Sequence, residues 1–127
     1  MFYFGNLIFL FGGDIENLTI QQFQRRTIPA SLDFLKIPHH GSKSSTSLFE
    51  FVESIDVSCV TAYMRGSSQN PDLCVMKRYK EISNQIYATQ NQNNNNDDFG
   101  VVYTVFDIIN QSHKTVLQGN ACEYVCI

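Results

Sequence analysis

Short apolar runs alternate with polar, turn-rich segments along this chain. The first run, Leu7–Phe11, contains five consecutive aliphatic or aromatic residues, a length typical of a strand that is buried on both faces. Similar runs recur, and segments with helical spacing separate them. The predicted order is strand 7–11, helix 18–26, strand 34–37, helix 48–55, strand 57–62, polar loop 65–69, a helix capped by Asn70, and strand 85–89. Such alternation predicts a layered α/β fold.

The last third of the chain departs from this alternation. Residues 100–109 and 114–117 are rich in β-branched and aromatic residues, and the polar turn between them predicts an antiparallel hairpin. Residues 120–127 predict a short edge strand. Residues 90–98 are almost all Asn, Asp and Gln and cannot bury apolar surface, so they predict a loop expansion. We expect His113, in the hairpin turn, to be an ordinary surface residue.

Two predicted strands end in side chains that can do chemistry. Gly12-Gly13-Asp14 follows the first strand, and Pro38-His39-His40-Gly41 follows the second. In α/β sheets, ligand sites lie beyond the carboxyl ends of the strands, so we expect Asp14 and the two histidines to meet. A carboxylate and neutral imidazoles bind Zn²⁺ or another divalent metal, which can supply hydroxide at neutral pH. One alternative stays open, because so few ligands also suit a histidine pair that only caps its strand and bonds its own loop.

The segment that begins at Gly41 allows three other interpretations of its function. The serines at 44, 45 and 47 open the next predicted helix, where a phosphate can bind, although helix capping explains the same residues. The Gly-Ser-Lys sequence at 41–43 lacks the earlier glycine of a phosphate-binding P-loop. A triad of Ser42, a histidine and Asp14 lacks the nucleophile elbow that would support it.

Composition narrows the class of protein. The chain has 127 residues, 43% of them hydrophobic, which predicts one domain, 1–127, with a core. A formal net charge of -3 gives no general basic field, so charge does not support a nucleic-acid partner. The four cysteines form no Cys-x-x-Cys pair and predict free thiols in a reducing compartment; the alternative is that Cys122 and Cys126, with three residues between them, pair or bind metal. The apolar N-terminus has no basic n-region or cleavage site and is shorter than the roughly 20 residues of a membrane span, so we expect a cytoplasmic protein without a membrane partner.

Two segments carry a resemblance to a known family. Residues 7–16 end a strand in Gly-Gly-Asp, and residues 33–45 contain Lys-Ile-Pro-His-His-Gly-Ser-Lys. Together they resemble the second half of metallo-β-lactamase-fold hydrolases, in particular the soluble domain of ComEC-like bacterial DNA-uptake competence proteins. The resemblance continues through residues 47–55, 70–73 and 97–101.

This resemblance implies a fold and a set of roles. The fold would be half of an αββα sandwich: a mixed sheet with helices on one face and a C-terminal β-hairpin. Asp14 would bridge two metals, His40 would be the last metal-binding imidazole, and His39 would contact the substrate or the transition state. Ser42, Lys43 and Asn70 are further candidates for substrate contact.

The chain also departs from the family pattern. Its 127 residues contain no His-x-His-x-Asp-His motif, and Asn70-Pro71 stands where the family carries His-Pro. We therefore expect a truncated or split metal-dependent hydrolase that is inactive in isolation, and the family resemblance implies phosphoesters as its substrates. Half a sandwich would leave apolar sheet surface uncovered at 7–11 and 99–106, so we expect association with a complementary half or with itself. The alternative is a non-catalytic interaction module that keeps the fold without a complete metal site.

Overall fold

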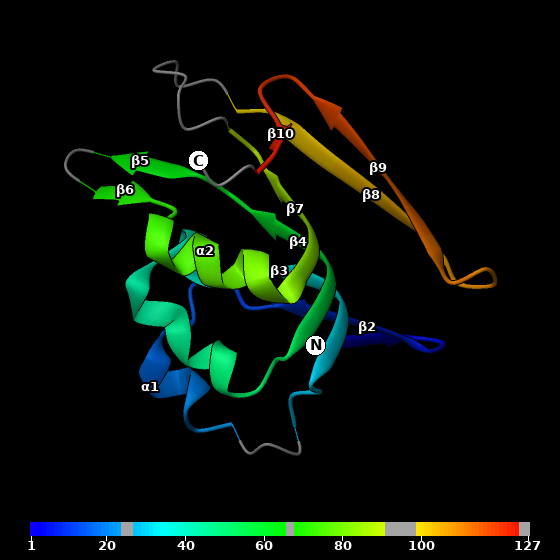
Figure 1. The fold of residues 1–127 in the computed structure, drawn as a ribbon, viewed down its shortest axis with the longest axis horizontal. Helices are drawn as coiled ribbons and strands as arrows, with labels where there is room; N and C mark the ends of the chain where they lie inside the picture. The colour runs from blue at the N-terminus through cyan, green and yellow to red at the C-terminus, as the bar shows by residue number, and fades with distance from the viewer. Residues whose placement is uncertain (24–26, 66–67, 91–98, 125–127) are drawn as a thin grey trace.

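A six-stranded mixed sheet forms the centre of the molecule (Figure 1). The computed structural model describes residues 1–23, 27–65, 68–90 and 99–124. The sheet has the order β1 (Phe2–Phe4), β2 (Leu7–Phe11), β3 (Ser31–Lys36), β4 (Ser54–Val60), β7 (Ser83–Ala88) and β10 (Cys122–Glu123). Strands β2, β3, β4 and β7 are parallel, and the short strands β1 and β10 pair antiparallel at the two edges. The predicted α/β class is confirmed, because the apolar runs became the parallel strands.

Helical segments cover one face of this sheet and bury the main core against it. They are α1 (Asn17–Ile20), the 3₁₀ segments η1 (Pro38–Gly41) and η2 (Lys43–Glu50), and α2 (Leu73–Ile82). The core brings together apolar side chains of the strands and of these segments, among them Leu10, Leu35, Ile37, Val60, Leu48, Met76 and Tyr79. Each parallel strand leads through this layer into the next, so the strands' carboxyl ends lie at one edge of the sheet.

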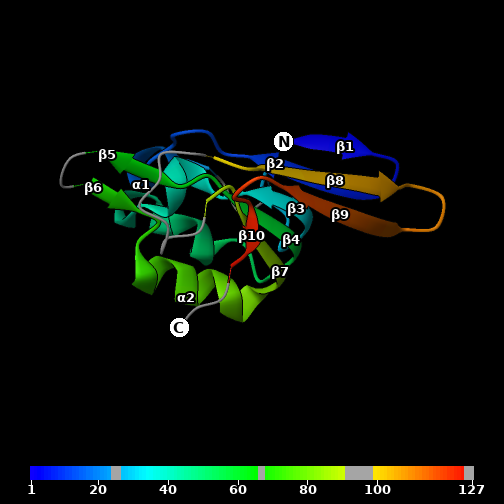
Figure 2. The same cartoon turned by 90° about the horizontal axis from the view of Figure 1, so that it is seen from above.

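The predicted terminal hairpin lies on the opposite face. It consists of β8 (Val101–Asp107) and β9 (Ser112–Gln118), which form a separate two-stranded sheet. Figure 2 shows α2 and this hairpin on opposite sides of the six-stranded sheet. Phe106 packs on Phe9 with ring centroids 4.7 Å apart. His113 lies 3.0 Å from Asp56 Oδ2 through Nδ1 and 3.0 Å from Gln85 Oε1 through Nε2, so it holds the hairpin to the sheet and is not an ordinary surface residue.

Several predicted elements were wrong in type or extent. The helix at 48–55 is absent, because the serine-rich segment forms a 3₁₀ turn and β4 already begins at Ser54. The helix at 18–26 appears only as the four residues of α1, and residues 24–26 lie outside the described part. The loop at 65–69 contains the ends of a small hairpin, β5 (Tyr63–Arg65) and β6 (Ser68–Asn70). Asn70 does not cap α2, since Asp72 accepts the helix's first amide hydrogen bonds.

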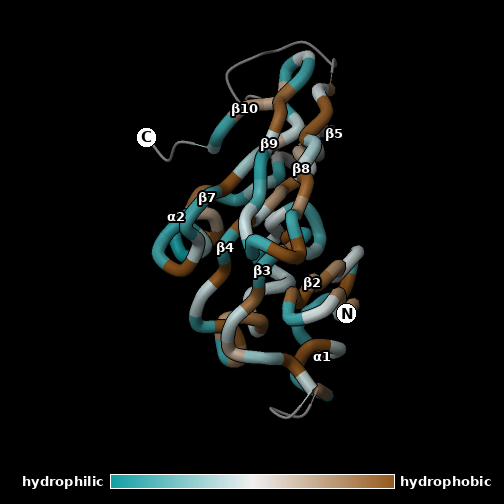
Figure 3. Tube along the Cα trace, turned by 90° about the vertical axis from the view of Figure 1, so that its right-hand side faces the viewer, coloured by the Kyte–Doolittle hydropathy of each residue, from teal (hydrophilic) through white to brown (hydrophobic). Residues whose placement is uncertain are grey.

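The apolar surface lies partly where it was expected. The hairpin covers part of the sheet face that was predicted to be open, and Leu7 and Leu10 are buried, while the Phe11 side chain at the end of β2 stays 52% exposed. The outer side of β8 remains open, with Tyr103 53% and Val105 70% exposed. Hydrophobic residues mark β2 and parts of β8 in Figure 3.

Two further predictions bear on the described residues. No helix among them is long and apolar enough to cross a membrane. Cys59, Cys74 and Cys122 are free thiols, as expected, and Cys126 lies outside the described residues, as does nearly all of the predicted loop at 90–98.

Candidate functional site at the carboxyl ends of β2 and β3

The Gly-Gly-Asp turn after β2 packs against the Pro-His-His turn after β3. The His39 amide donates a hydrogen bond to the Gly13 carbonyl oxygen at 2.8 Å. A Cβ atom on Gly12 would lie 2.8 Å from Pro38 Cγ, so only glycine permits this approach of the two turns. The two turns therefore meet, as predicted, and the histidine ring that faces the Asp14 carboxylate is that of His40.

Both histidines have a left-handed backbone. His39 has φ 46° and ψ 43°, and His40 has φ 55° and ψ 25°, directly before Gly41 at φ 73°. Left-handed φ is unfavourable for side chains with a Cβ and persists only where the surroundings impose it, often at functional sites. The turn is held from the α2 side, because the Asp72 amide donates to the Gly41 carbonyl oxygen at 3.0 Å. The chain therefore holds two left-handed residues in succession at the carboxyl end of β3.

The ring of His40 is oriented by Thr61, just after β4. Its Nδ1 lies 3.0 Å from the Thr61 carbonyl oxygen, which accepts from a protonated Nδ1, and 2.9 Å from Thr61 Oγ1, which can donate to an unprotonated Nδ1. Its Nε2 faces Asp14 and lies 3.7 Å from its Oδ1. A carbonyl partner at the other ring nitrogen is common among metal-binding histidines.

His39 points to different partners. Its Nδ1 lies 2.9 Å from Ser44 Oγ and 3.5 Å from Glu16 Oε1. The ring is 30% exposed and does not share the position between His40 and Asp14. The two adjacent histidines therefore have separate environments, which agrees with separate roles.

Three predicted substrate contacts have structural partners. Lys43 Nζ lies 3.3 Å from Asp72 Oδ2, in an ion pair that joins η2 to α2. Burial raises the pKa of Asp72, but hydrogen bonds from the amides of α2 and from Lys43 outweigh it and bring the pKa below its ordinary value. Ser42 Oγ accepts from the Ser44 amide, which makes it a cap of η2. Asn70 lies in β6, two residues before the cap of α2.

A lysine that the sequence reasoning missed lies beside the site. Lys36 Nζ donates to Thr61 Oγ1 at 3.0 Å, and the same oxygen lies 2.9 Å from His40 Nδ1. Burial lowers the pKa of Lys36, and the neighbouring Cys59 and Asp14 act in the opposite direction. Glu16 and Thr61 were also missed. Both could have been predicted from the tendency of ligand sites to lie beyond the carboxyl ends of the strands, because Glu16 follows Asp14 by two residues and Thr61 directly follows β4.

The geometry of Asp14 and His40 fits two ligands of one metal. Two ligands of a tetrahedral zinc ion, each at about 2.1 Å, lie roughly 3.4 Å apart. The observed 3.7 Å between Asp14 Oδ1 and His40 Nε2 needs only a small closure, and the 77% exposed Asp14 side chain has room to make it. Among the described residues, however, no group of three or more His, Cys, Asp or Glu side chains could hold a metal. These residues fit part of a metal site, and the further ligands would have to come from elsewhere.

Comparison with family models, with curated proteins and with solved structures finds no match for this chain.

Proposed function

We propose that this chain forms one wall of a metal-dependent hydrolase site of the metallo-β-lactamase type. Asp14 and His40 hold the metal, and His39 contacts the substrate, which the resemblance suggests is a phosphoester. The other ligands come from a complementary half that carries the His-x-His-x-Asp-His motif, and hydrolysis requires that half. The two halves together form the αββα sandwich.

One observation carries this proposal. His40 is held by Thr61 through Nδ1, which lies 3.0 Å from the Thr61 carbonyl oxygen, while its Nε2 faces the Asp14 carboxylate at 3.7 Å. The His113 and Asp56 pair offers a contrast within the same chain. Its ring nitrogens contact Asp56 and Gln85 oxygens at 3.0 Å each, which is the geometry of a structural link.

The chemistry follows from these positions. A divalent metal bound there would lower the pKa of a bound water and supply hydroxide near neutral pH. His39, held by Ser44 and near Glu16, can donate a hydrogen bond or a proton to a developing oxyanion from beside the metal position. The partly buried ammonium of Lys36 adds positive charge beyond Thr61, which favours an anionic substrate.

Metal titration tests the half-site directly. We expect calorimetry with Zn²⁺ or Mn²⁺ to detect weak one-to-one binding by the wild-type chain, and its loss in Asp14→Ala and in His40→Ala. His113→Ala is the matched control, because it removes another imidazole beside a carboxylate, and we expect it to keep the metal. A wild-type chain that binds no metal, or equal loss in the His113 variant, would contradict the half-site.

Complementation tests the catalytic part of the proposal. Mixing the chain with a polypeptide that carries the His-x-His-x-Asp-His half should produce hydrolysis of bis(p-nitrophenyl) phosphate that neither partner shows alone. His39→Ala should lower this rate by about 10²-fold or more, the usual contribution of a general acid, while leaving metal binding unchanged.

The second candidate is a non-catalytic interaction module. Two observations favour it: the described residues offer only two metal ligands in one place, and the outer side of β8 presents Tyr103 and Val105 to solvent. Under this alternative, Val105→Lys would reduce association in sedimentation experiments, the metal content would stay near zero, and Asp14→Ala would associate like the wild-type chain.

A further inference from the structure

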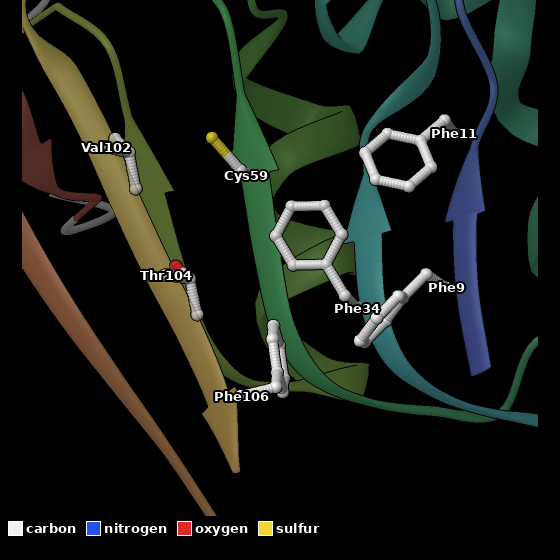
Figure 4. Close-up of a pocket in the computed structure, with 7 residues that line it drawn as sticks. All are labelled: Phe9, Phe11, Phe34, Cys59, Val102, Thr104 and Phe106. Carbon is white, nitrogen blue, oxygen red and sulfur yellow. The ribbon is translucent and has the colours of Figure 1, made fainter. Parts of the chain in front are cut away.

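An apolar cavity separates β8 from the six-stranded sheet. Its volume is about 270 Å³, and β2, β3 and β4 contribute its floor while β8 contributes its roof (Figure 4). It is lined by Phe9, Phe11, Phe34, Cys59, Val102, Thr104 and Phe106. Four of these seven are phenylalanines, so the walls are predominantly aromatic.

Strand register places Lys36 next to the lining residues of this cavity, on the same face of the sheet. Phe11 pairs with Lys36, and Lys36 pairs with Cys59, across three neighbouring parallel strands. Directly paired residues project from the same face of a sheet, so Lys36 lies between two residues that line the cavity. Phe34, two residues earlier on β3, projects from the same face. The stem of Lys36 therefore adjoins the aromatic walls, and its ammonium reaches toward Thr61 at the strand ends.

The Lys36 ammonium forms no ion pair within the described part of the chain, and the Asp14 carboxylate acts on it only from beyond ion-pair distance. Its recorded contacts are with Thr61 Oγ1 at 3.0 Å and the Ile37 carbonyl oxygen at 3.4 Å. No described carboxylate lies within the 4.0 Å of an ion pair. A partly buried cation that has lost hydration attracts an anion more strongly than an exposed lysine does.

The cavity is large enough for a two-ring aromatic group. An apolar cavity of about 150 Å³ takes up benzene, so a space nearly twice as large accommodates two fused rings. The Phe9 and Phe34 rings meet edge to face with centroids 6.2 Å apart, and the Phe34 and Phe11 rings are tilted with centroids 5.5 Å apart. Such surfaces favour another planar ring by stacked or edge-to-face contact.

We propose that this cavity binds a planar aromatic anion, with its rings between β8 and the phenylalanines of β2 and β3 and its anionic group at Lys36. The ligand class is an aryl carboxylate or aryl phosphate of about two fused rings. This binding requires neither a bound metal nor hydrolysis, so it can occur even if the proposed metal half-site does not bind metal. Its anionic group would lie beside Thr61 and thus near His40, at the strand ends that carry the candidate metal ligands.

Fluorescence titration with 2-naphthoate tests this site, and 2-naphthalenemethanol serves as the neutral probe of the same shape. The chain contains no tryptophan, so naphthalene emission can be followed with little protein background. We expect saturable one-to-one binding of naphthoate, at least tenfold tighter than of the alcohol. Lys36→Met, which keeps the stem and removes the charge, should abolish that preference while leaving the affinity for the alcohol within about twofold. Lys114→Met, on exposed β9, is the matched control and should behave as the wild type.

A second variant tests the position of the rings. Val102→Trp fills the cavity from the hairpin without touching the helical core, and it should weaken both probes at least tenfold. In the wild-type chain, naphthoate should shift the backbone amide signals of Phe34, Cys59 and Thr104 more than those of Tyr103 and Val105. Equal binding of both probes, an unchanged preference in Lys36→Met, or shifts confined to the outer side of β8 would each overturn the proposal.

Discussion

Replacing the two histidines by glycine or by alanine separates backbone strain from side-chain contacts. Either replacement removes the rings, but only glycine relieves the left-handed conformation, which has φ 46° at His39 and 55° at His40. The left-handed conformation costs a residue with a Cβ about 1–2 kcal/mol, and glycine avoids this cost. The greater freedom of glycine in the unfolded chain offsets roughly 0.5–1 kcal/mol of the stability that glycine gains in this way. We therefore expect glycine to exceed alanine by about 0.5–1 kcal/mol in free energy of unfolding at each position.

Urea unfolding of the paired variants measures this difference. The double variant His39→Gly/His40→Gly should exceed His39→Ala/His40→Ala by about 1–2 kcal/mol, or roughly 4–8 °C in Tm for a chain of this size. Lys77 is the control because it is exposed in the middle of α2, where glycine should instead be about 1 kcal/mol less stable than alanine. If alanine equals or exceeds glycine at the histidines while the Lys77 control behaves normally, the turn is not left-handed and the strain argument fails.

Three further predictions concern other parts of the structure. Asp72→Ala should destabilise the fold by about 1 kcal/mol at neutral pH, since it removes the cap of α2 and the partner of Lys43. The pKa of Asp72 is below its ordinary value in the folded state, so this contribution is fully present above pH about 4 and is lost as the pH falls through the folded pKa. The free energies of unfolding of the wild type and of Asp72→Ala should therefore converge between neutral and acid pH. A difference that stays constant with pH would contradict this. Burial raises the pKa of the Cys59 thiol, so peptide mapping after iodoacetamide treatment near neutral pH should find exposed Cys74 labelled well before Cys59, and equal rates would refute the buried position. His113→Ala should lower the free energy of unfolding by about 1 kcal/mol, because it removes the contacts of His113 with the partly buried Asp56 and Gln85; a Tm equal to that of Lys114→Ala would show that these contacts do not stabilise the fold.

The sequence allowed the parallel strands and the hairpin to be predicted for a simple physical reason. Leu7–Phe11 and the runs like it are too short for helices and too apolar for loops, so burial as strands was the remaining solution. The meeting of Asp14 with the histidines followed from the same order, because parallel strands place their carboxyl ends together.

The parts that failed depend on tertiary contacts. Apolar residues at 48–55 had helical spacing, but Ser45 and Ser47 are buried and the chain enters β4 at Ser54, so packing outweighed the periodicity. His113 was expected in a polar turn, but it lies in β9, where it pairs with Phe106. Its role depends on Asp56 and Gln85, which are 57 and 28 residues away in sequence, and local pattern carries no information about them. Lys36 falls within the predicted strand 34–37, and only the strand register reveals which side chains flank it.

The way in which the β8–β9 hairpin is attached has a consequence for how the native state opens. Within the described residues, no ladder hydrogen bonds join β8 or β9 to the six-stranded sheet, and side chains such as Phe106 and His113 hold the hairpin in place. Such a unit can detach at a lower free energy than global unfolding, so its amides should exchange with deuterium earlier than those of β3 and β4. Detachment would expose Phe9 and Phe34 side by side on an intact sheet. Aggregation of this protein should therefore follow the population of this partly open state, under conditions in which the parallel core is still folded.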